Sequence, residues 1–141
     1  MSNSELRHVT RDSAVSISPE TTVEDAISAV MDFTPTEDGV SVYYVYVTDN
    51  EDLVGVVSMR ELLNAENSVP VSEIMTTEVV TIDSSSTSQA AIRQIIKHRF
   101  PVLPVSDGGT FVGIVRASDV IDALDEQTTK RMFKQAGFWF R

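Results

Sequence analysis

Two pairs of side chains stand out by type and spacing, because each sets a carboxylate three residues after another polar group. Ser58 and Glu61 form the first pair. A Ser followed three residues later by Glu is the pattern of a capping box, in which each side chain bonds the other residue's backbone N–H. Arg116 and Asp119 form the second pair, in which the arginine suits either a phosphate or a nearby acid. Asp122 stands three residues further on, on the helix face that Asp119 would share.

The groupings that catalysis needs are missing from the sequence. It has no cysteine, which excludes disulfides, thiolate metal sites and cysteine nucleophiles. Its two histidines, His8 and His98, have no metal-ligand spacing to each other, and neither a P-loop nor a nucleophile-elbow motif occurs. We therefore expect a protein that is not an enzyme.

The charge balance narrows the class of partner. The net charge is −10, with 21 acidic against 11 basic residues, which argues against nucleic acid because phosphate binding needs clustered Lys and Arg. Cation binding and simple solubility both fit this acidity. No apolar run approaches the ~20 residues of a membrane helix, and residues 1–11 lack the apolar core of a signal peptide. The chain is cytosolic in character, as an excised part of a membrane protein would also be.

An internal repeat organises the chain. Residues 55–62 (GVVSMREL) return as residues 113–120 (GIVRASDV), at an offset of 58. Earlier segments repeat at an offset of 65, as residues 15–17 and 80–82 illustrate. The difference of seven residues falls in the first copy, where residues 32–39 have the composition of a loop.

Each copy predicts the element order β-α-β-β-α. The first helix of each copy follows polar capping residues, at 22–25 and 83–87, and carries apolar residues at spacings of three and four. In the first copy we expect an opening strand over 14–17, a β-rich run over 40–48, a turn over 49–52, a second strand that ends at Val57 and a closing helix from near Met59. In the second copy the corresponding features are expected over 79–82, 100–105 and 107–109, with a strand that ends at Val115 and a closing helix from near Ala117.

We therefore expect an α/β (α+β) fold of two repeats packed about a pseudo-two-fold axis, since a unit of about 60 residues buries little surface alone. The predicted organisation is an N-terminal tail over 1–8, one domain over 9–68, a second over 69–125, and a C-terminal connecting helix or tail over 126–141.

The repeat, which ends in Gly-Val-Val-Ser-x-x-Glu-Leu and Gly-Ile-Val-x-x-x-Asp-Val, resembles the CBS domain over residues 9–125. CBS domains occur in pairs (Bateman modules) as regulatory appendages. Segments 42–49, 53–63, 71–75 and 100–105 resemble, more narrowly, the cytosolic region of MgtE-type magnesium transporters. That resemblance implies a Mg²⁺ sensor at the cytoplasmic face of the cell membrane. It further implies a homodimer through the CBS pair and a membrane pore domain as partner, reached through the helix after Asp122.

The CBS resemblance implies a site for an adenine nucleotide, ATP or AMP, in which a Ser or Thr and an Asp three residues on hold the ribose. The matching residues are Ser58 and Glu61 at the ribose, Tyr44 and Phe100 as walls of the adenine pocket, and Arg60 at the phosphate. Glu61 is one methylene longer than the usual Asp. A capping box alone, with the two aromatic residues as ordinary core, stays open as the alternative.

The MgtE resemblance implies Asp119 and Asp122 as ligands of Mg²⁺, which prefers carboxylate oxygens and water. A solvated acidic helix face is the alternative. The sequence departs from the family in several charged positions: Lys130 and Arg131 replace residues that are often acidic, Gln89 and Arg99 replace other acids, and Arg116 stands where a ribose site has Ser or Thr.

Three hypotheses follow. The first is the gating domain of an MgtE-like divalent-cation transporter, which senses Mg²⁺ and, as a further ligand, adenine nucleotide. The second is a free-standing CBS pair that senses adenine nucleotide and regulates a partner enzyme or channel. The third is a dimerisation scaffold without a ligand. The sequence leaves the transported cation and the dimer arrangement open.

Overall fold

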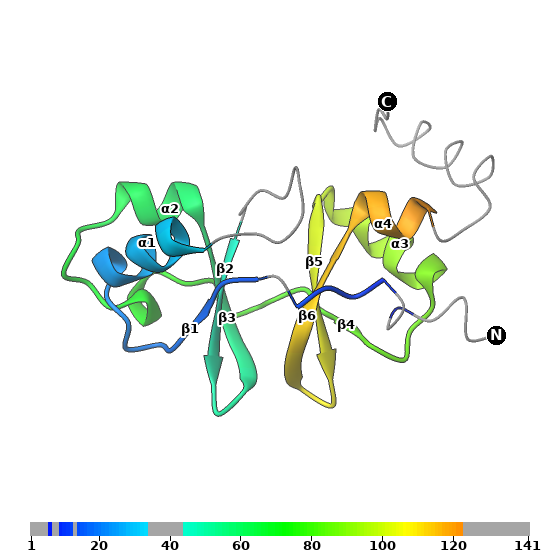
Figure 1. The fold of residues 1–141 in the computed structure, drawn as a ribbon, viewed down its shortest axis with the longest axis horizontal. Coiled ribbons are helices and arrows are strands. Elements are labelled where there is room, and N and C mark those ends of the chain that lie inside the picture. The colour runs from blue at the N-terminus through cyan, green and yellow to red at the C-terminus, as the bar shows by residue number, and fades with distance from the viewer. Residues whose placement is uncertain (1–5, 7–8, 13, 34–43, 123–141) are drawn as a thin grey trace. The chain divides into compact units, whose positions relative to one another are not determined.

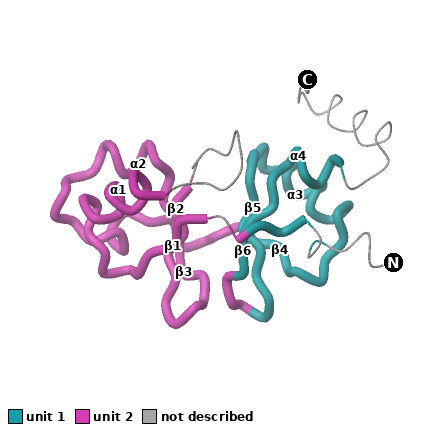
Figure 2. Tube along the Cα trace, in the orientation of Figure 1, with its two compact units in different colours: residues 1–11, 81–108, 112–141 teal, residues 12–80, 109–111 magenta. Residues whose placement is uncertain are grey.

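The computed structural model describes residues 6, 9–12, 14–33 and 44–122. Within it the chain forms two compact units (Figure 2). We term residues 12–80 with 109–111 the first-repeat unit, and residues 1–11 with 81–108 and 112–141 the second-repeat unit. The start of the chain thus belongs to the unit of the second repeat, and residues 109–111 belong to that of the first. The division into two CBS domains at the predicted boundaries stays a proposal.

The first-repeat unit has the predicted order β-α-β-β-α (Figure 1). Its elements are β1 (Ser16–Ile17), α1 (Val23–Asp32), β2 (Tyr44–Asp49), β3 (Asp52–Ser58) and α2 (Met59–Asn64). β2 pairs in parallel with β1 and antiparallel with β3, and α1 packs on α2. The core consists of Val15, Val23, Ala26, Val45, Val47, Val57, Leu62 and Val71.

The second-repeat unit repeats this order. Its elements are β4 (Ile82–Asp83), α3 (Ser88–His98), β5 (Val102–Asp107), β6 (Thr110–Arg116) and α4 (Ala117–Asp122). β5 lies between β4, to which it is parallel, and β6, while α3 packs on α4. Its buried apolar residues include Leu6, Ile82, Ala91, Ile92, Ile95, Leu103, Val105, Val115, Val120 and Ile121.

Local sequence explains where the two longer helices begin. Thr22 is the N-cap of α1, and its side chain accepts the backbone N–H of Asp25 at 3.2 Å. Thr87 is the N-cap of α3 and accepts the N–H of Ala90 at 3.1 Å. Both side chains satisfy a helix N–H that has no partner within the helix. The predicted helix starts are therefore confirmed.

The two hairpins turn in the same way. Each has a two-residue loop with positive φ at both residues, 51° at Asn50 and 72° at Glu51 in the first, 60° at Gly108 and 95° at Gly109 in the second. This geometry matches the twist of paired strands. Glycine adopts it without steric cost, whereas Asn50 and Glu51 do not.

Each repeat is preceded by a segment that docks on the last strand of the other repeat. Thr76 and Val56 of β3 exchange two backbone hydrogen bonds, of 2.9 and 3.0 Å, and Arg11 and Ile114 of β6 exchange two of 2.8 and 2.7 Å. The two bridges are equivalent by the offsets of 65 and 58 in the sequence. The docking of Arg11 on β6 accounts for the place of residues 1–11 in the second-repeat unit.

Some predictions lie outside the described residues. Of the predicted loop over 32–39, only Asp32 and Phe33 are described, as the end and the C-cap of α1. Residues 40–43 of the predicted strand and the predicted connecting helix over 126–141 also lie outside. In the part of the chain that is described, no helix is long and apolar enough to cross a membrane.

Candidate functional site

The start of α2 forms the capping box that the sequence predicts. Ser58 ends β3 and is the N-cap of α2. Its Oγ accepts the backbone N–H of Glu61 at 3.1 Å, and Oε1 of Glu61 accepts the N–H of Ser58 at 2.8 Å. The two side chains are therefore held in fixed positions at the point where the strand becomes a helix.

Two of the other candidate residues, Tyr44 and Arg60, can be placed near this cap. Tyr44, at the start of β2, is half-buried and lies opposite Ser58 in the strand register. Directly opposed residues in antiparallel strands are close neighbours on one face of the sheet. Arg60 and Glu61 lie in the first turn of α2, and both are exposed.

The chemistry of this group suits an anionic ligand that also carries hydroxyls. A carboxylate has about four acceptor positions, so Glu61 can keep its bond to Ser58 and accept others. Arg60 is the only Lys or Arg between residues 12 and 80. A phosphate bound in this region of the acidic first repeat therefore has one guanidinium available from the same unit.

Phe100 belongs to the second-repeat unit and precedes β5. Its ring stacks on the imidazole of His98, with the ring centroids 5.4 Å apart and the planes 12° apart. Arg99 stands between them in the left-handed conformation, with φ of 57°, as the C-cap of α3. No sequence pattern predicted this aromatic contact.

The equivalent pair in the second repeat is an ion pair. Arg116, the last residue of β6, binds Asp119 of α4 with Nε at 2.9 Å from Oδ2 and Nη2 at 3.1 Å from Oδ1. The sequence left phosphate and a nearby acid open as partners of Arg116, and in the structure Arg116 pairs with the acid Asp119. The helix start of this repeat therefore uses charge where the first repeat uses a neutral serine.

Arg11 also binds Asp119, a contact that no local sequence pattern predicted. Its Nε lies 2.6 Å from Oδ2 and its Nη2 3.0 Å from Oδ1. Burial raises the pKa of Asp119, but the hydrogen bonds and charges of Arg11 and Arg116 outweigh it, so that the pKa lies below its ordinary value. Asp119 is therefore a fixed negative charge between two arginines.

Asp122 is the last residue of α4 and is exposed. In the described residues no group of three or more His, Asp or Glu side chains is arranged to hold a metal ion. Asp125 and Glu126, which extend the acidic stretch in sequence, lie outside them. Asp119 and Asp122 thus share a helix, but only Asp122 presents its carboxylate to solvent.

Comparison with known proteins identifies two copies of one domain family in this chain. The family model of the CBS domain matches twice, over residues 6–68 and 71–126. The magnesium transporter MgtE of Thermus thermophilus is 36% identical over 115 residues, which are 80% of this chain and 25% of the transporter. An inosine-5'-monophosphate dehydrogenase of Korarchaeum cryptofilum is 35% identical over 108 residues, which are 75% of this chain and 21% of that enzyme.

A solved structure agrees with these relatives. The cytosolic domain of the Mg²⁺ channel MgtE in complex with ATP superposes with a TM-score of 0.80 at 32% identity, over 86% of this chain and 49% of that one. This chain spans a quarter or less of the length of the two curated relatives. The two family matches cover most of the chain, which therefore belongs to the CBS domain family as a tandem pair.

Proposed function

We propose that this chain is the regulatory CBS pair of an MgtE-like transporter for Mg²⁺ or another divalent cation. It acts without catalysis, at the cytoplasmic face of the membrane, as a homodimer that reports intracellular Mg²⁺ and adenine nucleotide to a membrane pore domain. The observation that carries the proposal is the agreement of sequence and fold with the cytosolic domain of MgtE, whose solved structure contains ATP. A ligand that binds one conformation better than another shifts the population toward it, which is how such a module would regulate a pore.

The start of α2 is the proposed contact for ATP or AMP. Glu61 and Ser58 would accept and donate hydrogen bonds to the ribose hydroxyls, and Tyr44, opposite Ser58, would contact the base. Arg60 would bind phosphate. Phe100 of the second-repeat unit is the remaining candidate wall of the adenine pocket.

Mg²⁺ is the second proposed ligand. Asp122 is the candidate whose carboxylate is exposed. Asp119, the second candidate from the sequence, already binds two guanidinium groups, so the proposed contact is Asp122 alone. Mg²⁺ usually keeps several waters and takes one or two protein carboxylates, so a single exposed aspartate is enough for a site completed by a second subunit.

A free-standing CBS pair that senses adenine nucleotide and regulates an enzyme or channel is the second candidate. The comparable similarity to part of an inosine-5'-monophosphate dehydrogenase, an enzyme, indicates that CBS pairs like this one also occur outside transporters. The coding sequence that flanks this chain separates the candidates. Several apolar runs of ~20 residues there would support the transporter, because each would be long enough to span a bilayer.

Thermal unfolding tests ligand binding directly, because a ligand of the native state raises the midpoint by mass action. We expect ATP or AMP to raise the midpoint of the wild-type chain and to raise it less in Arg60→Met and Glu61→Gln. Glutamine at Glu61 keeps the capping box but removes the charge. Glu73→Gln, which neutralises an exposed carboxylate elsewhere in the first-repeat unit, is the matched control.

The cation arm compares MgCl₂ with KCl at equal ionic strength, since surface charges respond to salt alone. A rise in midpoint beyond the KCl control, reduced in Asp122→Asn, supports Mg²⁺ sensing. If neither nucleotide nor Mg²⁺ moves the midpoint, the chain is not a sensor by itself, and the scaffold hypothesis gains.

A further inference from the structure

The Asp119 carboxylate joins two arginines that are distant in sequence. Both bind it side-on, with Nε on Oδ2 and Nη2 on Oδ1, and Arg11 lies 108 residues away along the chain. An ionised carboxylate offers about four acceptor positions, and these four hydrogen bonds fill them. The Asp119 side chain is only 13% exposed, so water competes weakly for these positions.

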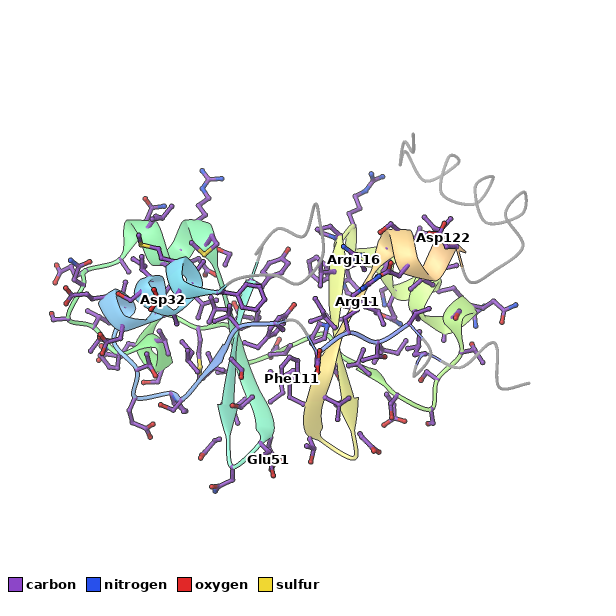
Figure 3. The ribbon with its side chains drawn as sticks, viewed as in Figure 1. Arg11, Asp32, Glu51, Phe111, Arg116 and Asp122 are labelled. Carbon is purple, nitrogen blue, oxygen red and sulfur yellow. The ribbon has the colours of Figure 1, made fainter. Side chains whose placement is uncertain are left out.

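The backbone brings Arg11 to this place. Its N–H and C=O both pair with Ile114 of β6, at 2.8 and 2.7 Å. Gly113 permits the approach, because a Cβ there would overlap the carbonyl oxygen of Arg11. Arg116 comes from the end of the same strand, two residues beyond Ile114. The N-terminal segment and β6 thus present both guanidiniums to the first turn of α4 (Figure 3).

The first repeat has the backbone bridge without the charges. Thr76, the equivalent of Arg11, pairs with Val56 but has no charge to offer Glu61. Glu61 instead accepts the N–H of Ser58, three residues away. The long-range ionic contact is therefore an addition to the docking of the segment and not a requirement of the fold.

We propose that Arg11, Asp119 and Arg116 form an ionic latch, which fastens residues 9–12 to α4 and closes the Asp119 carboxylate to added ligands. Any movement of α4 away from β6 must break these hydrogen bonds or carry the N-terminal segment with it. Arg11 and Arg116 are thus positioning residues for α4. The proposal does not depend on the proposed transporter role.

The closure follows from the cost of displacement. A cation or a hydroxyl that binds Asp119 needs lone pairs that the guanidiniums now hold. It would also have to separate the carboxylate from both guanidiniums, and because the Asp119 side chain is only 13% exposed, water would replace these hydrogen bonds poorly. Asp119 consequently acts as an internal anion for the two arginines.

Amide hydrogen exchange measured by NMR on the 141-residue chain tests the latch. The readout is exchange at the amides of Arg11 and Ile114, which form the bridge beneath it. We expect Asp119→Asn to accelerate both by about tenfold or more, since hydrogen bonds to charged groups are the stronger ones. Arg11→Met, which leaves Asp119 paired with Arg116, should accelerate them less.

Two controls are built into the chain. The amides of Val56 and Thr76 form the equivalent bridge of the first-repeat unit and should not change. Asp107→Asn removes an exposed carboxylate of the second-repeat unit and should leave the Arg11 and Ile114 amides unchanged. If Asp119→Asn unfolds the unit, so that all its amides exchange, Arg11→Met decides the result.

Unchanged exchange at Arg11 and Ile114 in both latch variants would overturn the latch. MgCl₂ against KCl of equal ionic strength tests the closure in the wild-type chain. No difference at these two amides supports it. Faster exchange in Mg²⁺, absent from Asp119→Asn, would overturn it by making Asp119 a cation ligand that the arginines release.

Discussion

The two repeats share a backbone plan but use the start of the closing helix differently. In the first, Glu61 accepts the N–H of Ser58 and closes a cap within one turn. In the second, the equivalent Asp119 binds the side chains of Arg116 and of Arg11, which arrives from the other end of the chain. An arginine in place of serine thus accompanies a change from a local cap to a long-range tie. The first repeat leaves its carboxylate exposed, while the second binds its carboxylate to two arginines.

The largest effect should come from the glycines beneath the two bridges. Gly113 has φ of 149°, and a Cβ there would overlap the Arg11 carbonyl oxygen and lie 2.9 Å from its carbon. We expect Gly113→Ala to lower the free energy of unfolding by about 3 kcal/mol or more, because backbone must move. Urea denaturation measures this change.

Gly55→Ala is the matched variant in the first repeat. There the new methyl would meet the side chain of Met75, with Cγ at 2.9 Å. A methionine side chain is flexible and can change rotamer, so we expect a smaller loss, about 1 to 2 kcal/mol. Equal losses at the two glycines would contradict the distinction between backbone and side-chain contact.

The next largest effect compares the stability that Asp119 contributes through the ionic latch with the stability that Glu61 contributes through the capping box. Asp119→Ala removes four hydrogen bonds and leaves two arginines adjacent, so we expect a loss of about 2 to 3 kcal/mol in the free energy of unfolding. Glu61→Ala removes one arm of an exposed capping box and should cost about 0.5 to 1 kcal/mol. A larger loss at Glu61 than at Asp119, measured by the same denaturation, would reverse our comparison.

The contribution of the latch to the free energy of unfolding should decrease gradually as the pH falls. The pKa of Asp119 is lower in the folded chain than its ordinary value, so its contribution to stability is present above the unfolded-state pKa of about 3.9 and is lost as the pH falls through the folded value. We expect the stability difference between wild type and Asp119→Asn to be constant from about pH 6 to 8 and smaller at pH 3. A difference that does not shrink in acid would exclude the carboxylate charge as its source.

The sequence predicted what depends on local pattern. Thr22 and Thr87 cap helices whose first residues follow directly in the sequence, so the helix starts could be predicted from neighbouring residues. The internal repeat then allowed each element of one copy to be predicted from the other. The capping box of Ser58 and Glu61 could be predicted for the same reason, because its two residues are three apart in the sequence. These features need no knowledge of which distant segments meet.

The contact of Arg11 with Asp119 could not be predicted from the sequence, because the two residues are distant along the chain. It spans 108 residues and depends on an exchange of leading segments between the repeats. The signal was present in the offset of 65, which relates Arg11 to Thr76 and the fully buried Leu6 to the fully buried Val71. Leu6 lies in the stretch that we expected to be a tail. Extending the repeat further toward the N-terminus would have marked Leu6 as a core position.

The smallest expected effect tests a hydroxyl that only the first repeat carries. Tyr46 is 2% exposed and stacks on Phe111, with centroids 5.1 Å apart, and its hydroxyl is buried with no hydrogen-bond partner among the described residues. The equivalent position in the second repeat is Pro104. Burial, and then the nearby Tyr44, raise the pKa of Tyr46, so the phenol stays neutral at ordinary pH.

Tyr46→Phe should therefore leave the free energy of unfolding unchanged or raise it by up to about 1 kcal/mol, because a buried hydroxyl without a partner costs free energy. Pro104→Ala changes the equivalent position and serves as the comparison in the same denaturation series. A loss of about 1 kcal/mol or more in Tyr46→Phe would mean that the hydroxyl bonds a group outside the described residues. The first repeat would then also depend on a polar contact beyond its capping box, and the contrast between a local first repeat and a latched second repeat would weaken.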